Sequence, residues 1–181
     1  MDQRKSGFQP LAFTLITLAA LLRLMPHPPN FTPVGGAALF GGARLRGWQA
    51  YVVPLAVMLV TDPLRSLIEG HYPAYSWTTL VVYGSFLISV LLGRVLLRDS
   101  SSVRQIASVA FFGSVQFYLF TNLPSWWSNP IYGHTVAGFV ACYVAALPFF
   151  GRTLLGDLFY SGILFGAYAM FSRRFPAEQH A

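Results

Sequence analysis

Asp157 is the residue whose chemical type and position most directly indicate a site. It lies inside the last apolar segment of the chain, where Thr153 and Tyr160 would share its face of a helix. An ionisable group in such a segment is costly and is usually paired or functional. Two interpretations follow. Asp157 forms the polar floor of a solute pocket, or it has a structural role, either paired with Arg152 or Arg23 or as a first-turn carboxylate favoured by the helix dipole.

Arg23 and Asp62 are further charged side chains beside apolar segments. The Arg23 guanidinium could bind an anionic group through two hydrogen bonds, or extend to the membrane surface. Asp62 precedes Pro63, which is typical of a helix cap, so we expect a short interfacial helix over residues 63–69.

Both residues belong to a set of polar and aromatic side chains that we expect on the outer face. A pocket is favoured for this set, and an interfacial aromatic belt is the alternative. The candidate substrate-binding residues are Arg23, His27, Asn30, Asp62, Trp77, Asn122, Arg152, Asp157 and Tyr160.

The remaining reactive side chains form no pattern of a catalytic or metal site. His27, His71 and His134 lack the spacing of zinc-binding helices, and Cys142 is interpreted as a small buried apolar residue. No Gly-x-Ser-x-Gly sequence occurs, and the glycine-rich run lacks the Lys-Ser/Thr of a phosphate-binding loop. We therefore expect no enzyme activity, no metal ion and no cofactor.

The composition places these residues in a membrane protein. Of the 181 residues, 55% are hydrophobic and 10% are charged, whereas a soluble domain carries about a quarter charged residues. The mean hydropathy is +0.54. The net charge of +6 is interpreted as a signal of membrane orientation, not of nucleic-acid binding. A single cysteine rules out a disulfide framework.

Uncharged apolar stretches predict an all-α membrane protein, a bundle of six transmembrane helices in one integral membrane domain over residues 1–181. The stretch 105–151 is too long for one crossing, and we expect breaks at Asn122-Leu123-Pro124 and at Asn129-Pro130. The piece 134–150 is then a short extra helix in the outer leaflet or a re-entrant one. Thr32, Ser76 and Thr153 are the predicted helix caps. The spans are predicted at residues 9–25, 31–44, 47–62, 76–97, 104–122 and 153–172.

The distribution of basic residues favours six crossings over seven. Short cytoplasmic loops carry an excess of Lys and Arg, and six crossings leave only Arg23, Arg65 and Arg152 outside. This predicts a multi-pass protein of the bacterial inner membrane with both termini cytoplasmic. A seventh crossing by residues 134–150 gives a weaker bias and stays open as the alternative. The predicted inner residues are Arg4, Lys5, Arg44, Arg46, Arg94, Arg98, Arg104, Arg173 and Arg174.

The run Gly35–Ala43 holds four glycines and three alanines in nine residues. Small residues at this spacing let helix backbones approach closely in lipid. Tight packing against a neighbouring helix is the favoured interpretation, and the functional one is a docking face for a partner subunit or close approach to a ligand. The candidate docking residues are Gly35, Ala37, Ala38, Gly41 and Gly42.

Several short runs resemble a family of small uncharacterised bacterial integral membrane proteins (DUF6580-like). They are Pro28-Pro29-Asn30-Phe31-Thr32-Pro33-Val34-Gly35, Ala38-Leu39-Phe40-Gly41-Gly42, Thr121-Asn122 and Ala146-Leu147-Pro148-Phe149-Phe150…Leu155-Gly156-Asp157-Leu158. More distantly the chain is similar to the substrate-binding S components of energy-coupling-factor (ECF) vitamin transporters. In those proteins the second and third helices carry a Gly/Ala-rich run and then an Asp, here Gly35–Ala43 and Asp62. The biotin-type members carry a Pro-Phe…Gly-Asp-Leu run, here Pro148-Phe149 and Gly156-Asp157-Leu158 with longer spacing.

The resemblance implies an S-component-like six-helix fold and an outward-opening pocket for a small, vitamin-like solute. It also implies partners, a transmembrane coupling subunit with two ATPases. The Ala-x-x-x-Ala pair through which the first helix contacts that subunit is missing here, so Gly35–Ala43 serves for docking or the protein works alone. The expected function is a solute-binding and uptake subunit in the lipid bilayer. The alternatives are an assembly partner in a larger membrane complex and a membrane enzyme acting on a lipid or cofactor.

Overall fold

The computed structural model describes residues 9–70, 75–100 and 102–174, and every regular element in them is an α-helix. The all-α class predicted from the sequence is confirmed for these residues. The six helices are α1 (Gln9–Leu24), α2 (Val34–Arg44), α3 (Gln49–Glu69), α4 (Trp77–Leu96), α5 (Val103–Ser128) and α6 (Val136–Arg174).

Four of these helices are long and apolar enough to cross a membrane. They are α3 over Gln49–Ile68, α4, α5, and α6 over Val136–Ser172. α1 has 16 residues and α2 has 11, which correspond to about 24 Å and about 16 Å of helix. Length and composition therefore indicate a helical membrane protein. By itself, α2 is too short to cross a hydrocarbon core of about 30 Å.

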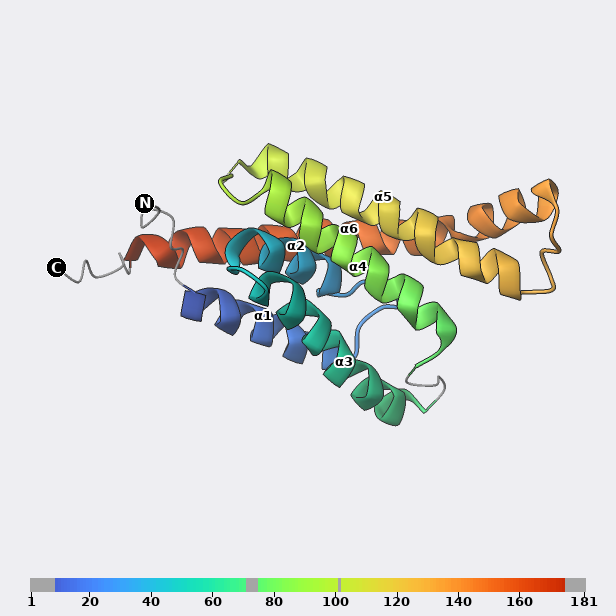
Figure 1. Ribbon diagram of the computed structural model, residues 1–181, viewed down its shortest axis with the longest axis horizontal. Coiled ribbons are helices and arrows are strands. Elements are labelled where there is room, and N and C mark those ends of the chain that lie inside the picture. The colour runs from blue at the N-terminus through green and yellow to red at the C-terminus, as the bar shows by residue number, and fades with distance from the viewer. Residues whose placement is uncertain (1–8, 71–74, 101, 175–181) are drawn as a thin grey trace.

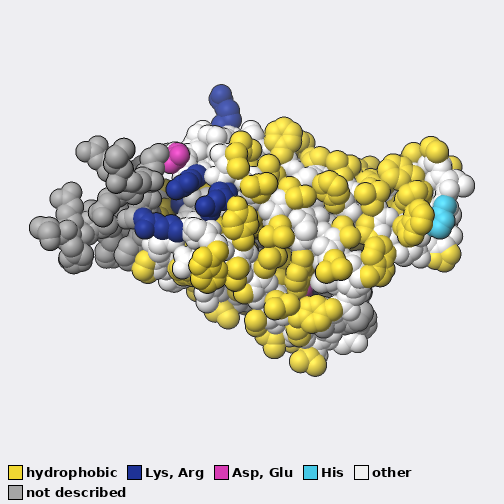
Figure 2. All heavy atoms as spheres, viewed as in Figure 1, with side chains coloured by type: hydrophobic (Ala, Val, Ile, Leu, Met, Phe, Trp, Pro, Cys, Tyr) yellow, Lys and Arg dark blue, Asp and Glu magenta, His cyan; other side chains and the backbone are white. Residues whose placement is uncertain are grey.

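The helices run alternately in opposite directions along the long axis of the molecule (Figure 1). α1 begins and α6 ends at the same end of the bundle. Lys and Arg side chains gather at this end on the face that Figure 2 shows, and apolar side chains cover the middle. We call it the basic end; Arg44, Arg46, Arg94, Arg98 and Arg104 belong to helix ends and connections there.

α2 is the centre of the bundle. It contacts all five other helices, and every residue from Val34 to Ala43 is buried. A side chain at Gly42 would overlap the carbonyl oxygen of Val90 on α4, and one at Gly93 on α4 would overlap that of Leu39. The glycines thus let the backbones of α2 and α4 touch.

The five predicted docking residues lie in this helix, and the chain's own helices cover them. Gly35 meets α6, Gly41 meets Pro54 of α3, and Gly42 meets α4; Ala37 and Ala38 are 6% and 0% exposed. Of the two interpretations of the run, packing against a neighbouring helix is the one observed. A partner subunit cannot reach these residues in this conformation.

α5 and α6 differ from the sequence prediction. The break expected at Asn122-Leu123-Pro124 is wrong, because α5 continues to Ser128, just before Asn129-Pro130. The separate helices expected over 134–150 and 153–172 are one continuous helix of 39 residues, so Thr153 is not a cap. Prolines are tolerated in apolar helices where other groups take up the freed backbone polarity. Pro148 leaves the carbonyl of Val144 without its N–H partner, and the Tyr118 hydroxyl donates to the adjacent carbonyl, that of Tyr143, at 2.6 Å.

α3 gives a second case of a proline inside a helix. The short helix expected over residues 63–69 is instead the last part of α3. Pro63 lacks the N–H that would bond to the carbonyl four residues earlier, at Leu59. The hydroxyl of Tyr75 donates to that carbonyl at 2.6 Å, which removes the cost of an unpaired acceptor.

The segment 25–33 connects α1 to α2 without helical structure and enters the bundle. Asn30 has a φ of 66°, a left-handed conformation that Asn adopts more readily than most residues. Gly156 on α6 leaves room for the backbone of Phe31 and Thr32. The cap predicted at Thr32 is wrong, since Pro33 is the N-cap and has no side chain to cap with. At Ser76 the predicted cap is confirmed, as part of a capping box.

Candidate functional site: a buried carboxylate at the floor of a polar cavity

Asp157 lies in the interior of the bundle, on α6. The residue is only 6% exposed. Ser114 on α5 donates its hydroxyl to Asp157 Oδ2 at 2.7 Å. Gly35, in the first turn of α2, lies against the carboxylate so closely that any side chain there would overlap it. The carboxylate is thus held by three helices.

The same carboxylate lies at the N-terminal end of α2. The first N–H groups of a helix have no partner within the helix, and they carry a partial positive charge. The first backbone bond closing this turn runs from Ala37 N–H to the Pro33 carbonyl at 2.8 Å. Pro33 offers no capping side chain, and the Asp157 carboxyl group, from another helix, lies beside this end of α2 at Gly35.

A cavity opens from Asp157 toward the end of the bundle opposite the basic end. Its inner part has a volume of about 50 Å³ and includes Asp157, Thr32 and Ser89 in its lining. Its outer part has a volume of about 190 Å³ and includes Tyr118 and Asn122. The parts share three lining residues, Asn30, Phe117 and Thr153. We call this two-part space the Asp157 cavity.

The walls of the Asp157 cavity combine hydrogen-bonding groups with aromatic rings. Asn30 and Thr32 come from the entering segment, Thr121 and Ser125 from α5, and Thr153 from α6. The aromatic side chains are Phe86, Phe117, Tyr118, Phe149 and Phe150. A small number of placed polar groups in a mostly apolar cleft is the usual composition of a small-molecule site.

Three of the nine predicted substrate-binding residues, Asn30, Asn122 and Asp157, line this cavity together. Thr153, expected on the same helix face as Asp157, lines it as well. Asn122 donates its side-chain N–H to the Tyr118 carbonyl at 2.8 Å. Tyr160 instead packs against Phe31, with ring centroids 5.6 Å apart.

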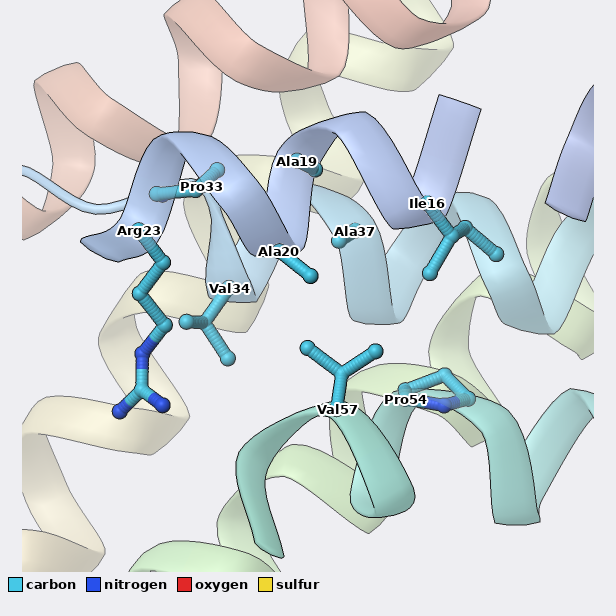
Figure 3. A pocket seen from close by; sticks show the side chains of 9 residues that line it. All are labelled: Ile16, Ala19, Ala20, Arg23, Pro33, Val34, Ala37, Pro54 and Val57. Carbon is cyan, nitrogen blue, oxygen red and sulfur yellow. The ribbon is translucent and has the colours of Figure 1, made fainter. Parts of the chain in front are cut away.

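Arg23 and Asp62 form a separate polar cluster that joins α1 to α3 and α4. Arg23 Nη2 lies 2.5 Å from Asp62 Oδ1, and Arg23 Nη1 donates to the Thr61 hydroxyl. Tyr83 donates to the other oxygen of Asp62 at 2.7 Å. The predicted pairing of Asp157 with Arg23 is therefore wrong, because Arg23 pairs with Asp62. Figure 3 shows Arg23 at one end of a small pocket otherwise lined by apolar side chains. Its volume of about 10 Å³ has room for about one water molecule.

The other predicted site residues are dispersed. His27 is half-buried, and its Nδ1 lies 3.1 Å from the Pro28 carbonyl oxygen. Trp77 is 54% exposed and Arg152 is exposed, and neither lines the Asp157 cavity. Among the described residues, no group of three or more His, Cys, Asp and Glu side chains could hold a metal ion.

Sequence reasoning missed several residues that shape the cavity, above all Ser114, Ser89 and Phe117. One available signal was the presence of polar residues in the middle of apolar segments. Ser89 and Gln116 are two such residues. In the structure they lie together, because Gln116 Nε2 donates to the Ser89 hydroxyl at 3.1 Å and to the Ser85 carbonyl at 3.0 Å. Phe117 gave no such signal, because its role depends on where α5 crosses α6.

Comparison with known proteins identifies a family without adding a function. No curated protein and no solved structure matches the chain. A model of the DUF6580 family, described as a family of unknown function, matches residues 5–178, which is nearly the whole chain. The chain therefore belongs to this family of unknown function.

Proposed function

We propose that the protein binds a small solute in the Asp157 cavity and serves its uptake across the bacterial inner membrane. The observation that carries this proposal is the buried carboxylate itself. Asp157 receives one side-chain hydrogen bond, from Ser114, and forms part of the lining of a cavity with Asn30 and Thr32. Charged groups kept inside apolar helices usually mark a substrate or ion pathway.

The depth of Asp157 supports the proposal. The Arg44 guanidinium at the basic end lies over the rings of Phe165 and Tyr168 on α6, at 5.1 Å and 5.5 Å from their centroids. Asp157 precedes Tyr168 by three helical turns, about 16 Å along α6. With Arg44 at the membrane surface, Asp157 lies near the middle of a hydrocarbon core of about 30 Å.

The path of the chain between α1 and α2 supports it further. Non-helical backbone is tolerated at membrane depth only where it is buried in protein or lines a cavity. Residues 25–33 meet this condition, because Asn30 and Thr32 line the cavity. We propose six crossings, the second formed by this segment and α2, with the basic end cytoplasmic. The N-terminus of a discontinuous helix beside a midplane cavity is a common arrangement in secondary transporters.

The lining indicates the kind of solute. A carboxylate floor favours a cationic or hydrogen-bond-donating group, and the rings of Phe117 and Tyr118 favour a flat or ring-containing body. This fits the vitamin-like class implied by the resemblance to ECF S components. A coupling subunit with ATPases would have to dock elsewhere than at Gly35–Ala43, because those residues are buried.

Native mass spectrometry of the full chain, purified gently from its own host, tests the proposal. We expect a bound small molecule in the wild type that is lost from Asp157→Asn, which keeps the shape of the side chain. Asp99→Asn, an exposed carboxylate between α4 and α5, is the matched control and should retain the molecule. Retention by Asp157→Asn, or no small molecule in the wild type, would count against a solute-binding function.

An assembly role in a larger membrane complex is the second candidate. The observation that favours it is an exposed apolar stripe along the first part of α6, formed by Val136, Val140, Val144 and Leu147. This stripe could face another protein as well as lipid. Recovery of a stoichiometric membrane partner in the same spectra, with no small ligand, would favour this role over solute uptake.

A further inference from the structure

A second cavity lies at the basic end, away from the Asp157 cavity. It has a volume of about 210 Å³ and lies between α5 and α6. Its walls include Ile106 and Ala107 on α5 and Gly162, Phe165 and Gly166 on α6. We call this space the α5–α6 groove. It shares no lining residue with the Asp157 cavity.

The groove is accessible from outside the bundle. Val103 on its α5 wall is 82% exposed, and Gly162 and Gly166 on its α6 wall are also exposed. Side chains added at these two glycines would meet nothing within 4 Å. In a membrane protein such a space, on the outside of two apolar helices, faces lipid and not water.

Arg44 gives the groove a charged end. Its Nη1 donates to the carbonyls of Leu97 and Arg98 at 3.0 Å and 2.7 Å, and its Nη2 donates to that of Ser100 at 2.6 Å. The side chain is therefore fixed against the α4–α5 connection. Its Nε is buried and has no hydrogen-bond partner among the described residues.

Further positive charge surrounds this end. Arg98 follows α4, and Arg104 is next to Val103 at the start of α5; both are exposed. Asp99 also lies in this connection and is exposed, so the local charge is an excess of positive over negative. Basic pockets between transmembrane helices on the cytoplasmic side bind anionic lipid head groups.

We propose that the α5–α6 groove is a binding site for one anionic phospholipid. An acyl chain lies along the Gly162–Gly166 face, where the absence of side chains leaves the space. The phosphate lies at the level of the α4–α5 connection, near Arg44 and Arg104. This site is distinct from solute binding at Asp157, so either can exist without the other.

Native mass spectrometry with defined lipids tests the site on the full chain. The detergent-purified protein is titrated with phosphatidylglycerol or with phosphatidylcholine of the same acyl chains. We expect one retained phosphatidylglycerol and about fivefold weaker retention after Arg104→Gln, which removes one surface charge. Equal retention of the two lipids by the wild type would overturn the proposal.

Variants that fill the α5–α6 groove test the location of the proposed lipid site. Gly166→Leu should abolish the retained phosphatidylglycerol, whereas Gly151→Leu, on the same helix with equally open surroundings, should keep it. Ala107→Phe fills the groove from the α5 side and serves if Gly166→Leu alters the fold. Retention in a folded groove-filling variant equal to that of the wild type would contradict the site.

Discussion

Ser114 on α5 donates a hydrogen bond to the carboxylate of Asp157 on α6, although the two residues are 43 positions apart in the chain. Asp157 is only 6% exposed and is surrounded by Ser114, the first turn of α2 and the cavity. A buried carboxylate that loses a donor bears the cost of desolvation without compensation. This pair therefore contributes to the stability of the α5–α6 crossing.

Replacing Ser114 should destabilise the bundle. Ser114→Ala removes the donor to Asp157, and we expect a loss of about 1–3 kcal/mol in the free energy of unfolding. Denaturant unfolding in detergent measures it. Ser85→Ala is the matched control, because the equally buried Ser85 hydroxyl donates only to the Val81 carbonyl of its own helix. Equal effects of the two variants would show that the contact with Asp157 adds no stability.

Close packing of α2 on α4 should be sensitive to one methyl group. Gly42→Ala and Gly93→Ala each place a Cβ on a backbone carbonyl of the other helix, which cannot move as a flexible side chain can. We expect each to cost about 1–3 kcal/mol, as for overpacking elsewhere.

The control for this pair is Gly84→Ala on α4, where an added Cβ would meet nothing within 4 Å. This variant should be as stable as the wild type, or more stable by up to about 1 kcal/mol, because Ala favours helix. Thermal unfolding of the three variants in the same detergent separates the two outcomes. Similar melting temperatures for all three would contradict the backbone contact.

Removing one partner of the Arg23–Asp62 pair should lower the free energy of unfolding more than removing both partners. Arg23→Met leaves the part-buried Asp62 carboxylate with the Tyr83 hydroxyl as its remaining donor among the described residues, and we expect a loss of about 3–5 kcal/mol. The double variant Arg23→Met/Asp62→Leu should recover much of this loss. Arg152→Met, at an exposed position, should change stability by less than about 0.5 kcal/mol. A double variant less stable than Arg23→Met would refute this account.

The proposed orientation places the two ends of the bundle on opposite sides of the membrane. In a Cys142→Ala background, Ile131→Cys lies between α5 and α6 at a position 84% exposed. Trp48→Cys lies at the basic end at a position 69% exposed. A membrane-impermeant maleimide should label Ile131→Cys in intact cells and Trp48→Cys only after permeabilisation. The reverse pattern would place the basic end outside.

The helix ends that could be predicted are those with a local signal. The span predicted at 76–97 agrees closely with α4, because Ser76 forms a capping box that depends on adjacent residues only. The prolines were misread for the opposite reason. Pro63 and Pro124 lie within helices, and the hydroxyl that stabilises the turn at Pro63 comes from Tyr75, beyond the end of the helix.

The residues of the candidate site likewise divide into those that the sequence could identify and those that it could not. Asp157 could be found from sequence because a charge in an apolar segment is itself unusual. Its partner could not, since Ser114 is one of several serines in apolar helices and only the crossing of α5 and α6 selects it. Arg23 and Asp62 were both singled out, but their pairing across 39 positions depends on the packing of α1 against α3.

The central place of α2 has a consequence for how the protein is made. α2 contacts α6, which leaves the ribosome after the other five helices. Until α6 has been inserted, Gly35 and Gly36 lack the partners that cover them, and the short α2 must remain in an incomplete bundle. Domains generally complete their packing as units during synthesis. The packing around α2 is therefore completed only when α6 is inserted, and chains truncated within α6 should be recognised by membrane quality-control proteases.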